Sequence, residues 1–344
     1  MSIRFSVIIA TSNRPSLAAQ AIDSVLAQTY DNLEVIVVNN GSTEESLQIY
    51  SQHLTQLKQK YGDKVTLLPD TNTAYPALGP AIARNLGIQQ ASGNYIGFCD
   101  DDDIWIDDGY LEALADTLSR QSPDIVFADQ RAVDAAGSVK KASWFSPPVS
   151  EAQAAGQLEG HRHPPHPFIT TTPAHFYRHG GFPHLNITFY RRDLLSQWGG
   201  FRKDLFYEED MELFLRLSGH SKKVLHYPVV IAEHRIPGVD VTSASNILSD
   251  RDKLLTRLDM FSQLALTHHN PGVVQTARRG ASFTAKNLTL AYLSLGETGR
   301  AMRTAKLALS WDFSLKWLFG SAFLLIKHLL RPSANSTSTQ KDTV

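Results

Sequence analysis

The sequence predicts an α/β fold with a parallel sheet, followed by a purely helical extension. Between residues 5 and 99, short apolar runs with β-branched residues alternate with longer segments whose apolar residues recur every three or four positions. Strands that alternate with helices favour parallel pairing with right-handed crossovers, and ligands of such sheets bind beyond the carboxyl ends of the strands. After residue 244 only helical spacing remains.

The predicted elements follow one another in order. Residues 5–10 form the first strand, and the apolar pairs that follow between Leu17 and Leu26 form one face of a helix. The pattern then repeats as a strand at 33–38, a helix at 44–60, a strand at 65–68, a helix at 80–90 with proline near its start, and a strand at 95–99.

The middle of the chain is less regular. Residues 129–183 are rich in Pro, His, Gly and Thr and lose the periodicity, which predicts an irregular lobe or a set of long loops. Regular structure returns as a strand at 187–190 and helices at 192–198 and 211–217, the last begun by acidic residues that suit a helix N-terminus.

Composition limits the class of protein. The chain has 344 residues, 42% of them apolar, which suffices for an α/β core with an appendage. A formal net charge of -1 provides no general attraction to nucleic acid, so none is expected as a partner. Cys99 is the single cysteine and no signal peptide is recognisable at the N-terminus, so we expect a cytoplasmic location. The polar residues 332–344 are predicted to be a disordered tail.

The helical extension ends in an apolar segment. Residues 313–330 come nearest to a membrane span, but Lys316, Lys327 and His328 interrupt them before roughly 20 continuous apolar residues are reached. Aromatic residues beside lysines would suit peripheral contact with the anionic inner face of a membrane. They could equally pack on the rest of the protein, and the sequence leaves both possibilities open.

The clearest chemical signal is a run of four carboxylates, Asp100 to Asp103, directly after the strand at 95–99. Adjacent carboxylates repel one another, and a divalent cation would relieve that repulsion. A solvated acidic turn leading into a helix near Leu111 would explain the same residues. A calcium-binding EF-hand loop fits less well, because Ile104 and Trp105 stand where an oxygen ligand and glycine are needed.

Four segments decide between these interpretations. They are SVIIATSNRP at 6–15, VIVVNNGS at 35–42, ARNLG at 83–87 and GNYIGFCDDDD at 93–103. Their order and separation resemble the nucleotide-binding half of family-2 glycosyltransferases. Later segments extend the resemblance to about residue 245: FYRRD at 189–193, GGF at 199–201, EEDMELFLR at 208–216, and His234 after a short apolar strand.

The resemblance implies a fold, a domain plan and a reaction. The fold would be of the GT-A type, a Rossmann-like mixed sheet, over residues 1–245, with a donor half at 1–128 and an acceptor half at 129–245. An α-helical extension would occupy 246–331. The implied enzyme is metal-dependent and inverting. It would move a sugar from a nucleotide-diphospho-sugar to a hydroxyl of a glycan or lipid-linked acceptor, in the synthesis of cell-surface polysaccharide or glycolipid.

The resemblance also assigns the metal site. Asp100 and Asp102 would form the Asp-x-Asp element, with Asp102 coordinating Mg²⁺ or Mn²⁺ and Asp100 facing the ribose or a metal-bound water. Asp101 would lie with them at the donor. His234 corresponds to a position that helps to hold metal or diphosphate in relatives, although a lone histidine is more often packed or on the surface.

Further donor contacts are assigned to residues at the ends of the first strands and in one helix: Thr11, Asn13, Arg14, Asn39, Asn40 and Arg84. Ordinary turn chemistry would also explain the first five, and a structural ion pair would explain Arg84. Where many relatives have Asp-Asp or Asp-Asn before Gly-Ser, this chain has Asn39 and Asn40, which leaves the identity of the base open.

On the acceptor side, Asp210 matches the family's catalytic base, and helix capping is the alternative for Glu209 and Asp210. Six histidines at 161–184 lack zinc-site spacing, apart from His175 and His179, and an acceptor-facing loop is preferred. Two other functions remain open, a nucleotide-sugar binding module without turnover and a sugar-phosphate nucleotidyltransferase. Dehydrogenases and P-loop enzymes are excluded, because neither glycine-rich motif occurs at a strand-to-helix turn.

Overall fold

The computed structural model describes residues 2–68, 77–144, 161–163, 168–179, 182–236 and 248–330. The chain divides into two compact units, Met1–Ile247 with Leu264–Thr276, and Leu248–Gln263 with Ala277–Val344. The tail predicted at 332–344 lies outside the described residues.

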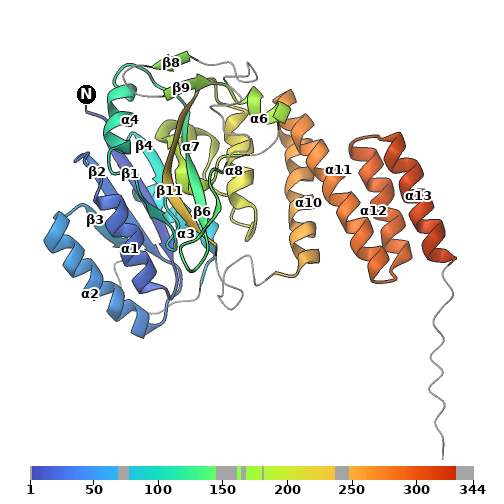
Figure 1. Cartoon of the computed structure of the whole chain (residues 1–344), viewed down its shortest axis with the longest axis horizontal. Helices are drawn as coiled ribbons and strands as arrows, with labels where there is room; N and C mark the ends of the chain where they lie inside the picture. The colour runs from blue at the N-terminus through green and yellow to red at the C-terminus, as the bar shows by residue number, and fades with distance from the viewer. Residues whose placement is uncertain are drawn as a thin grey trace, which may run out of the picture. The chain divides into compact units, whose positions relative to one another are not determined.

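The first part of the chain alternates strands and helices (Figure 1). In order, its elements are β1 (Phe5–Thr11), α1 (Pro15–Leu26), β2 (Leu33–Asn39), α2 (Glu44–Tyr61), β3 (Val65–Leu68), α3 (Pro80–Gln90), β4 (Tyr95–Phe98), β5 (Ile104–Trp105), α4 (Tyr110–Leu118) and β6 (Ile125–Val133). There follow β7 (Val139–Lys141), β8 (His161–His163), β9 (Phe168–Thr171), α6 (Ala174–His179), η1 (Leu185–Ile187), β10 (Thr188–Arg191), α7 (Arg192–Trp198), α8 (Glu209–Ser218) and β11 (Val224–Arg235).

These strands form one mixed sheet, nine of them in the order β3-β2-β1-β4-β10-β6-β11-β9-β8, while β5 pairs with β11 and β7 with β6. β3, β2, β1 and β4 are parallel, whereas β10 runs antiparallel to both β4 and β6. The predicted fold class, a mixed α/β sheet followed by helices, is therefore confirmed. The parallel half places the carboxyl ends of β1, β2 and β4 at one edge.

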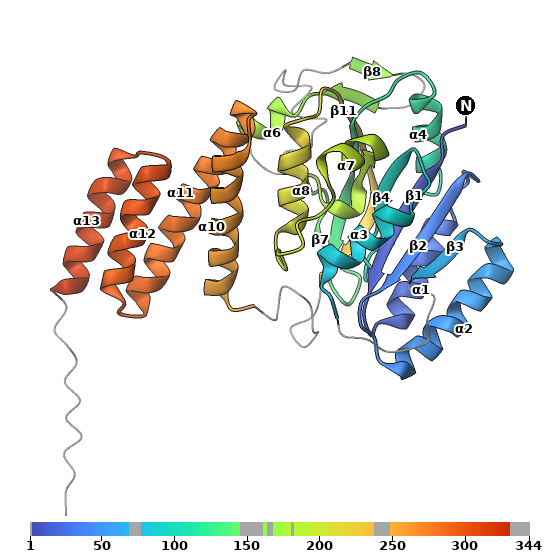
Figure 2. The same cartoon turned by 180° about the vertical axis from the view of Figure 1, so that it is seen from behind.

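Side chains of the sheet alternate between two covered faces. Phe5, Val7 and Ile9 belong to the core that α1 and α2 cover. Ile8 faces α3 instead, because a Cβ added to Gly87 of that helix would lie 2.5 Å from the Cγ2 atom of Ile8. Figures 1 and 2 show α1 and α2 on one face and α3 on the other. Burial on both faces explains why these strands are nearly continuous apolar runs.

The middle of the chain is more regular than predicted. β6 continues through Asp129 to Val133, because residues 129–133 pair with β11. β8, β9 and α6 also lie within the stretch predicted to be irregular. His234 lies inside β11 and not after a short strand. The register of β11 shifts between His226 and Val230, where Pro228 cannot donate to the ladder.

The helices after residue 248 are α10 (Asp250–Thr267), α11 (Pro271–Ser294), α12 (Thr298–Trp311) and α13 (Leu315–Leu329). In the second unit, buried alanines recur at helical spacing on α11 and α12, at positions 277, 281, 285, 301, 305 and 308. Small side chains let helices approach closely, and Ser282 Oγ donates to the Ala308 carbonyl over 2.8 Å. None of the described helices is long and apolar enough to cross a bilayer.

Candidate active site

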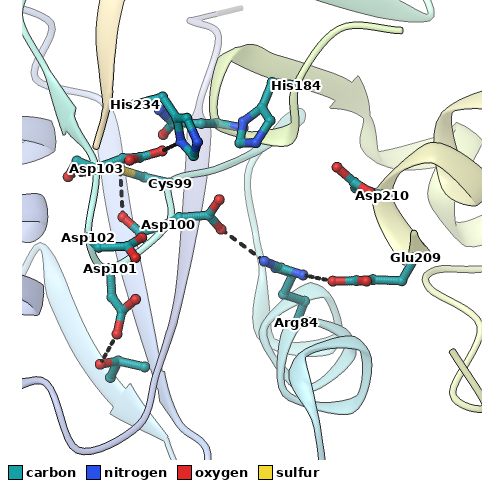
Figure 3. Close-up of polar contacts among 12 residues, drawn as sticks. Arg84, Cys99, Asp100, Asp101, Asp102, Asp103, His184, Glu209, Asp210 and His234 are labelled. Atoms are coloured by element: carbon teal, nitrogen blue, oxygen red, sulfur yellow. Dashed lines mark hydrogen bonds and ion pairs between the residues drawn. The ribbon is translucent and has the colours of Figure 1, made fainter. Parts of the chain in front are cut away.

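The predicted site residues gather at the carboxyl edge of the parallel strands. The acidic turn follows β4, and Arg84 of α3 lies between it and the start of α8 (Figure 3). His184, before η1, and His234, on β11, lie on the other side of the turn (Figure 3). Five elements distant in sequence therefore contribute to one polar region.

Asp101 ties the turn to the end of β1. Its buried carboxylate accepts a hydrogen bond from Thr11 Oγ1 at 2.6 Å and pairs with the Arg14 guanidinium, whose Nη2 atom lies 2.5 Å from Oδ1. Thr11 in turn accepts from the Tyr50 hydroxyl at 2.7 Å. Thr11, Arg14 and Asp101 thus bind one another, and their contact with the donor stays a prediction.

Asp102 retains access to solvent. Arg14 Nη1 donates to its Oδ2 atom at 2.8 Å, and about a quarter of the side chain, 24%, is exposed. One guanidinium therefore bridges Asp101 and Asp102 and reduces the repulsion between them. The carboxylate of Asp102 is partly exposed, whereas that of Asp101 is buried.

Arg84 links the acidic turn to α8. Its Nη2 atom donates to Asp100 at 2.8 Å and its Nη1 atom to Glu209 at 2.7 Å. Burial lowers the pKa of Arg84, but the charges of the two carboxylates outweigh this effect and raise it, so the group stays cationic. Burial likewise opposes ionisation of Asp100, yet the charge of Arg84 lowers the pKa of that carboxyl.

Asp103 holds His234. The carboxylate is fully buried and accepts from His234 Nδ1 at 3.0 Å and from the Arg235 backbone N–H at 2.8 Å. Burial raises the pKa of Asp103 to about 6. Burial opposes protonation of His234, but the hydrogen bond and charge of Asp103 raise its pKa. The contact with Asp103 holds the imidazole ring in one orientation.

A set of residues suited to a metal lies beside this pair. Ligand atoms of Asp100, Asp103 and His184 all lie within 4.8 Å of one another. Burial lowers the pKa of His184 to about 4, so its imidazole is neutral, and its Nδ1 atom accepts from the Asn186 N–H at 3.3 Å. The ring packs against Trp144, with centroids 5.1 Å apart. Carboxylates and imidazole together fit Mn²⁺, and carboxylates alone suit Mg²⁺.

Asp103, His184 and Trp144 were not among the predicted site residues. Asp103 could have been included, because it belongs to the same acidic run at a strand end. His184 was hidden within the His-rich segment, of which His175 and His179 lie in α6 and His166 lies outside the described residues. Trp144 has no sequence signal that points to the site.

The three predicted asparagines shape the neighbouring turns. Asn39 accepts from the Ser42 N–H at 3.1 Å, and Asn13, with a left-handed φ of 54°, accepts from the Thr43 N–H at 2.8 Å. Asn40 accepts from the backbone of Leu78 and Gly79 at 2.9 and 3.1 Å. These bonds fix the loops that border the edge, and contact with the base or ribose stays a prediction.

Asp210 lies in the first turn of α8, beside Glu209 (Figure 3). Its Oδ1 atom accepts from the Met211 N–H at 2.8 Å, and the preceding Glu208 has a left-handed φ of 65°. Burial, followed by the charges of Glu209 and Glu208, raises the pKa of Asp210 to about 7. A carboxylate poised near neutral pH is suited to accept a proton.

The family follows from a sequence comparison. The pattern of the family described as Glycosyl transferase family 2 matches residues 6–199, more than half of the chain. The chain belongs to glycosyltransferase family 2. An uncharacterized glycosyltransferase of Rickettsia bellii is 41% identical over 102 residues, which make up 30% of this chain and 13% of that protein. Glycosyltransferase GlyA of Streptococcus pneumoniae is 32% identical over 122 residues, 36% of this chain and 16% of that protein.

This family-2 chain therefore spans less than a fifth of these two relatives. Among solved structures, residues 1–349 of Staphylococcus aureus TarS in complex with UDP-GlcNAc match with a TM-score of 0.63 and 15% identity, covering 95% of this chain and 89% of that one. The mannosyltransferase PcManGT of Pyrobaculum calidifontis, in complex with GDP-Man and Mn²⁺, matches with a TM-score of 0.52 and 17% identity, covering 96% and 86%. These likenesses confirm the GT-A fold.

Proposed function

We propose that this chain transfers a sugar from a nucleotide-diphospho-sugar to a hydroxyl group of a glycan or lipid-linked acceptor, with inversion at the anomeric carbon. The observation that carries the proposal is the bridge of Arg84 between Asp100 and Glu209, which sets a base candidate, Asp210, across from the acidic turn. Family membership supports it, as do the UDP-GlcNAc and GDP-Man that TarS and PcManGT hold. The proposal includes a cytoplasmic location and a role in cell-surface glycan synthesis.

In the proposed reaction, Asp210 accepts the proton of the acceptor hydroxyl as its oxygen attacks the anomeric carbon. The bond from that carbon to the phosphate oxygen breaks, and the nucleoside diphosphate leaves with the bonding electrons. Attack from the side opposite the leaving group inverts the configuration. Arg84 and Arg14 hold the carboxylates of the acidic turn in place without a further proton transfer.

A divalent cation bound at the acidic turn would stabilise the negative charge of the leaving diphosphate. The residues that would hold it are the cluster of Asp100, Asp103 and His184. The family resemblance adds Asp102, whose carboxylate is partly exposed, and His234. Their donor atoms are carboxylate oxygens and imidazole nitrogens, which fit Mg²⁺ or Mn²⁺.

The metal assignment is tested by titrating donor with and without a chelator in the parent and in Asp102→Asn. We expect donor affinity to need Mg²⁺ or Mn²⁺ and to fall in the variant, because a charged ligand is lost. Asp101→Asn is the matched control, since its carboxylate is directed toward Thr11 and Arg14. Equal affinity with and without chelator would rule out a metal at the donor.

The reaction itself is tested by screening nucleotide sugars for metal-dependent release of nucleoside diphosphate, with the product anomer identified by NMR. Release of diphosphate with inversion supports the proposal. Binding without release would instead indicate a nucleotide-sugar binding module. Formation of pyrophosphate from a sugar phosphate and a nucleoside triphosphate would indicate a nucleotidyltransferase.

A further inference from the structure

Helix α13 is apolar on two opposite faces. One face packs within the second unit: Trp317 Nε1 donates to the Ala305 carbonyl at 3.2 Å, and Leu325 lies against the cluster around Leu288 and Tyr292. The other face has no covering residue in the part of the chain that the structure describes. It consists of Leu315, Phe319, Phe323, Ile326 and Leu330, which are 61%, 70%, 65%, 56% and 77% exposed.

These five residues form one continuous stripe. Their spacings of four, four, three and four positions keep them on the same side of a helix. Phe313, just before the helix, is also 66% exposed. Isolated exposed apolar residues are ordinary, but a contiguous aromatic and aliphatic stripe indicates an interaction surface. We call these six residues the α13 face.

The charges around the α13 face favour an anionic partner. Lys316 and Lys327 are exposed and lie on α13 one turn or less from the stripe. α13 itself contains no Asp or Glu. Between residues 277 and 330 the chain carries eight lysines and arginines against two carboxylates, whereas the whole chain has a net charge of -1. The positive charge is therefore concentrated in the segment that carries the apolar stripe.

We propose that the α13 face docks on the surface of an anionic lipid bilayer, with the helix lying in the plane of the interface. At about 1.5 Å per residue, a helix of this length reaches only about 22 Å, short of the roughly 30 Å hydrocarbon core. Aromatic and aliphatic side chains enter the boundary region while the lysines meet the lipid phosphates. The docking is independent of the transfer chemistry, and it would bring a lipid-linked acceptor to the enzyme.

Vesicle flotation of the full chain tests the docking. We expect the parent to float with vesicles of phosphatidylcholine and phosphatidylglycerol, and to float less at high salt or with phosphatidylcholine alone. Phe319→Asp should lower the partition coefficient about tenfold or more, since an apolar anchor becomes a charge. Lys316→Glu with Lys327→Glu should lower it by about fivefold for each lysine removed.

The matched control is Leu266→Asp, which puts the same charge on an exposed leucine of α10 that lies outside the α13 face. It should float like the parent. Absence of binding to anionic vesicles, or equal flotation of Phe319→Asp and the parent, overturns the proposal. The proposal is also overturned if light scattering shows that the parent is a dimer and that Phe319→Asp dissociates this dimer without changing flotation. Transfer to a soluble acceptor, assayed in parallel, is expected to be unchanged in every variant and tests the proposed function separately.

Discussion

Each carboxylate of the acidic turn pairs with a basic side chain, and Asp102 shares Arg14 with Asp101. Asp101 pairs with Arg14, Asp100 with Arg84 and Asp103 with His234, at distances from 2.5 to 3.0 Å. These pairs remove much of the repulsion that four adjacent aspartates would otherwise suffer. The turn is therefore held in shape by the protein itself, and the exposed oxygens of Asp100 and Asp102 stay available to a ligand.

Substitution of the proposed base gives the first prediction. Asp210→Asn keeps the shape of the side chain but cannot accept a proton, so single-turnover transfer should fall by roughly 10²- to 10⁴-fold. Donor and metal affinity should stay within a few-fold of the parent, because Asp210 lies on α8 and not at the acidic turn. Transfer within a few-fold of the parent would show that the base is another residue.

The pH dependence of transfer gives the second prediction. Burial and the charges of Glu209 and Glu208 raise the pKa of Asp210 to about 7, and the base acts only when ionised. The rate of transfer should therefore be constant above about pH 7 and fall about tenfold for each pH unit below it. Glu209→Gln removes a neighbouring negative charge and so lowers the pKa of Asp210. The acidic limb of the pH–rate profile should therefore move to lower pH. An unchanged limb in that variant would contradict the assignment.

At the scale of elements, β4 is the strand on which the site depends. It lies between β1 and β10 and ends directly at the acidic turn. Gly97 allows the Phe189 ring of β10 to lie against the strand, since an added Cβ would be 2.5 Å from Cε1 of that ring. Phe189 also contacts Phe5, with ring centroids 5.4 Å apart. Gly97 thus leaves the space that the Phe189 ring occupies.

The third prediction concerns this contact. Gly97→Ala should lower the free energy of unfolding by about 1–3 kcal/mol, because the added methyl overlaps an aromatic ring that is itself fully packed. Urea denaturation followed by circular dichroism measures the change. Gly109→Ala is the control, since its added Cβ meets Asp107 at an ordinary 3.6 Å. Equal stability of Gly97→Ala and the parent would mean that the ring can move aside.

At the scale of the whole molecule, the two compact units have different content. The first contains the sheet and all the proposed site residues, and the second contains helices alone among its described residues. The core of the second unit is built from alanines, Leu288 and Tyr292. The proposed site residues therefore all belong to the first unit.

The fourth prediction follows from that separation. Donor with Mn²⁺ at about 100 times its dissociation constant should stabilise the first unit by about 2.7 kcal/mol. Differential scanning calorimetry should show the transition of the sheet moving to higher temperature while that of the helices stays in place. Chelator should reverse the shift. Equal movement of both transitions would show that the units unfold together.

The sequence alone determined the parallel half of the sheet and the identity of its acidic turn. β1, β2 and β4 are buried on both faces, so they had to be short apolar runs, and the four aspartates are contiguous at the end of one of them. Apolar runs and contiguous aspartates are local features, so they can be recognised from residues that are adjacent in the sequence. The sequence did not predict the full lengths of β6 and β11. Pairing with a neighbouring strand, and not the local residue pattern, extends these strands past Asp129 and Pro228.

The tertiary structure decided what each polar residue does. Arg84 and Glu209 are 125 positions apart, so no local pattern predicts that the Arg84 guanidinium donates to both Glu209 and Asp100. Folding also made Asp101 an internal partner of Arg14 while leaving Asp100 and Asp102 partly exposed, although these side chains are chemically identical. Burial and neighbouring charge are properties of position in space, and they alone distinguish a structural aspartate from one that can meet a ligand.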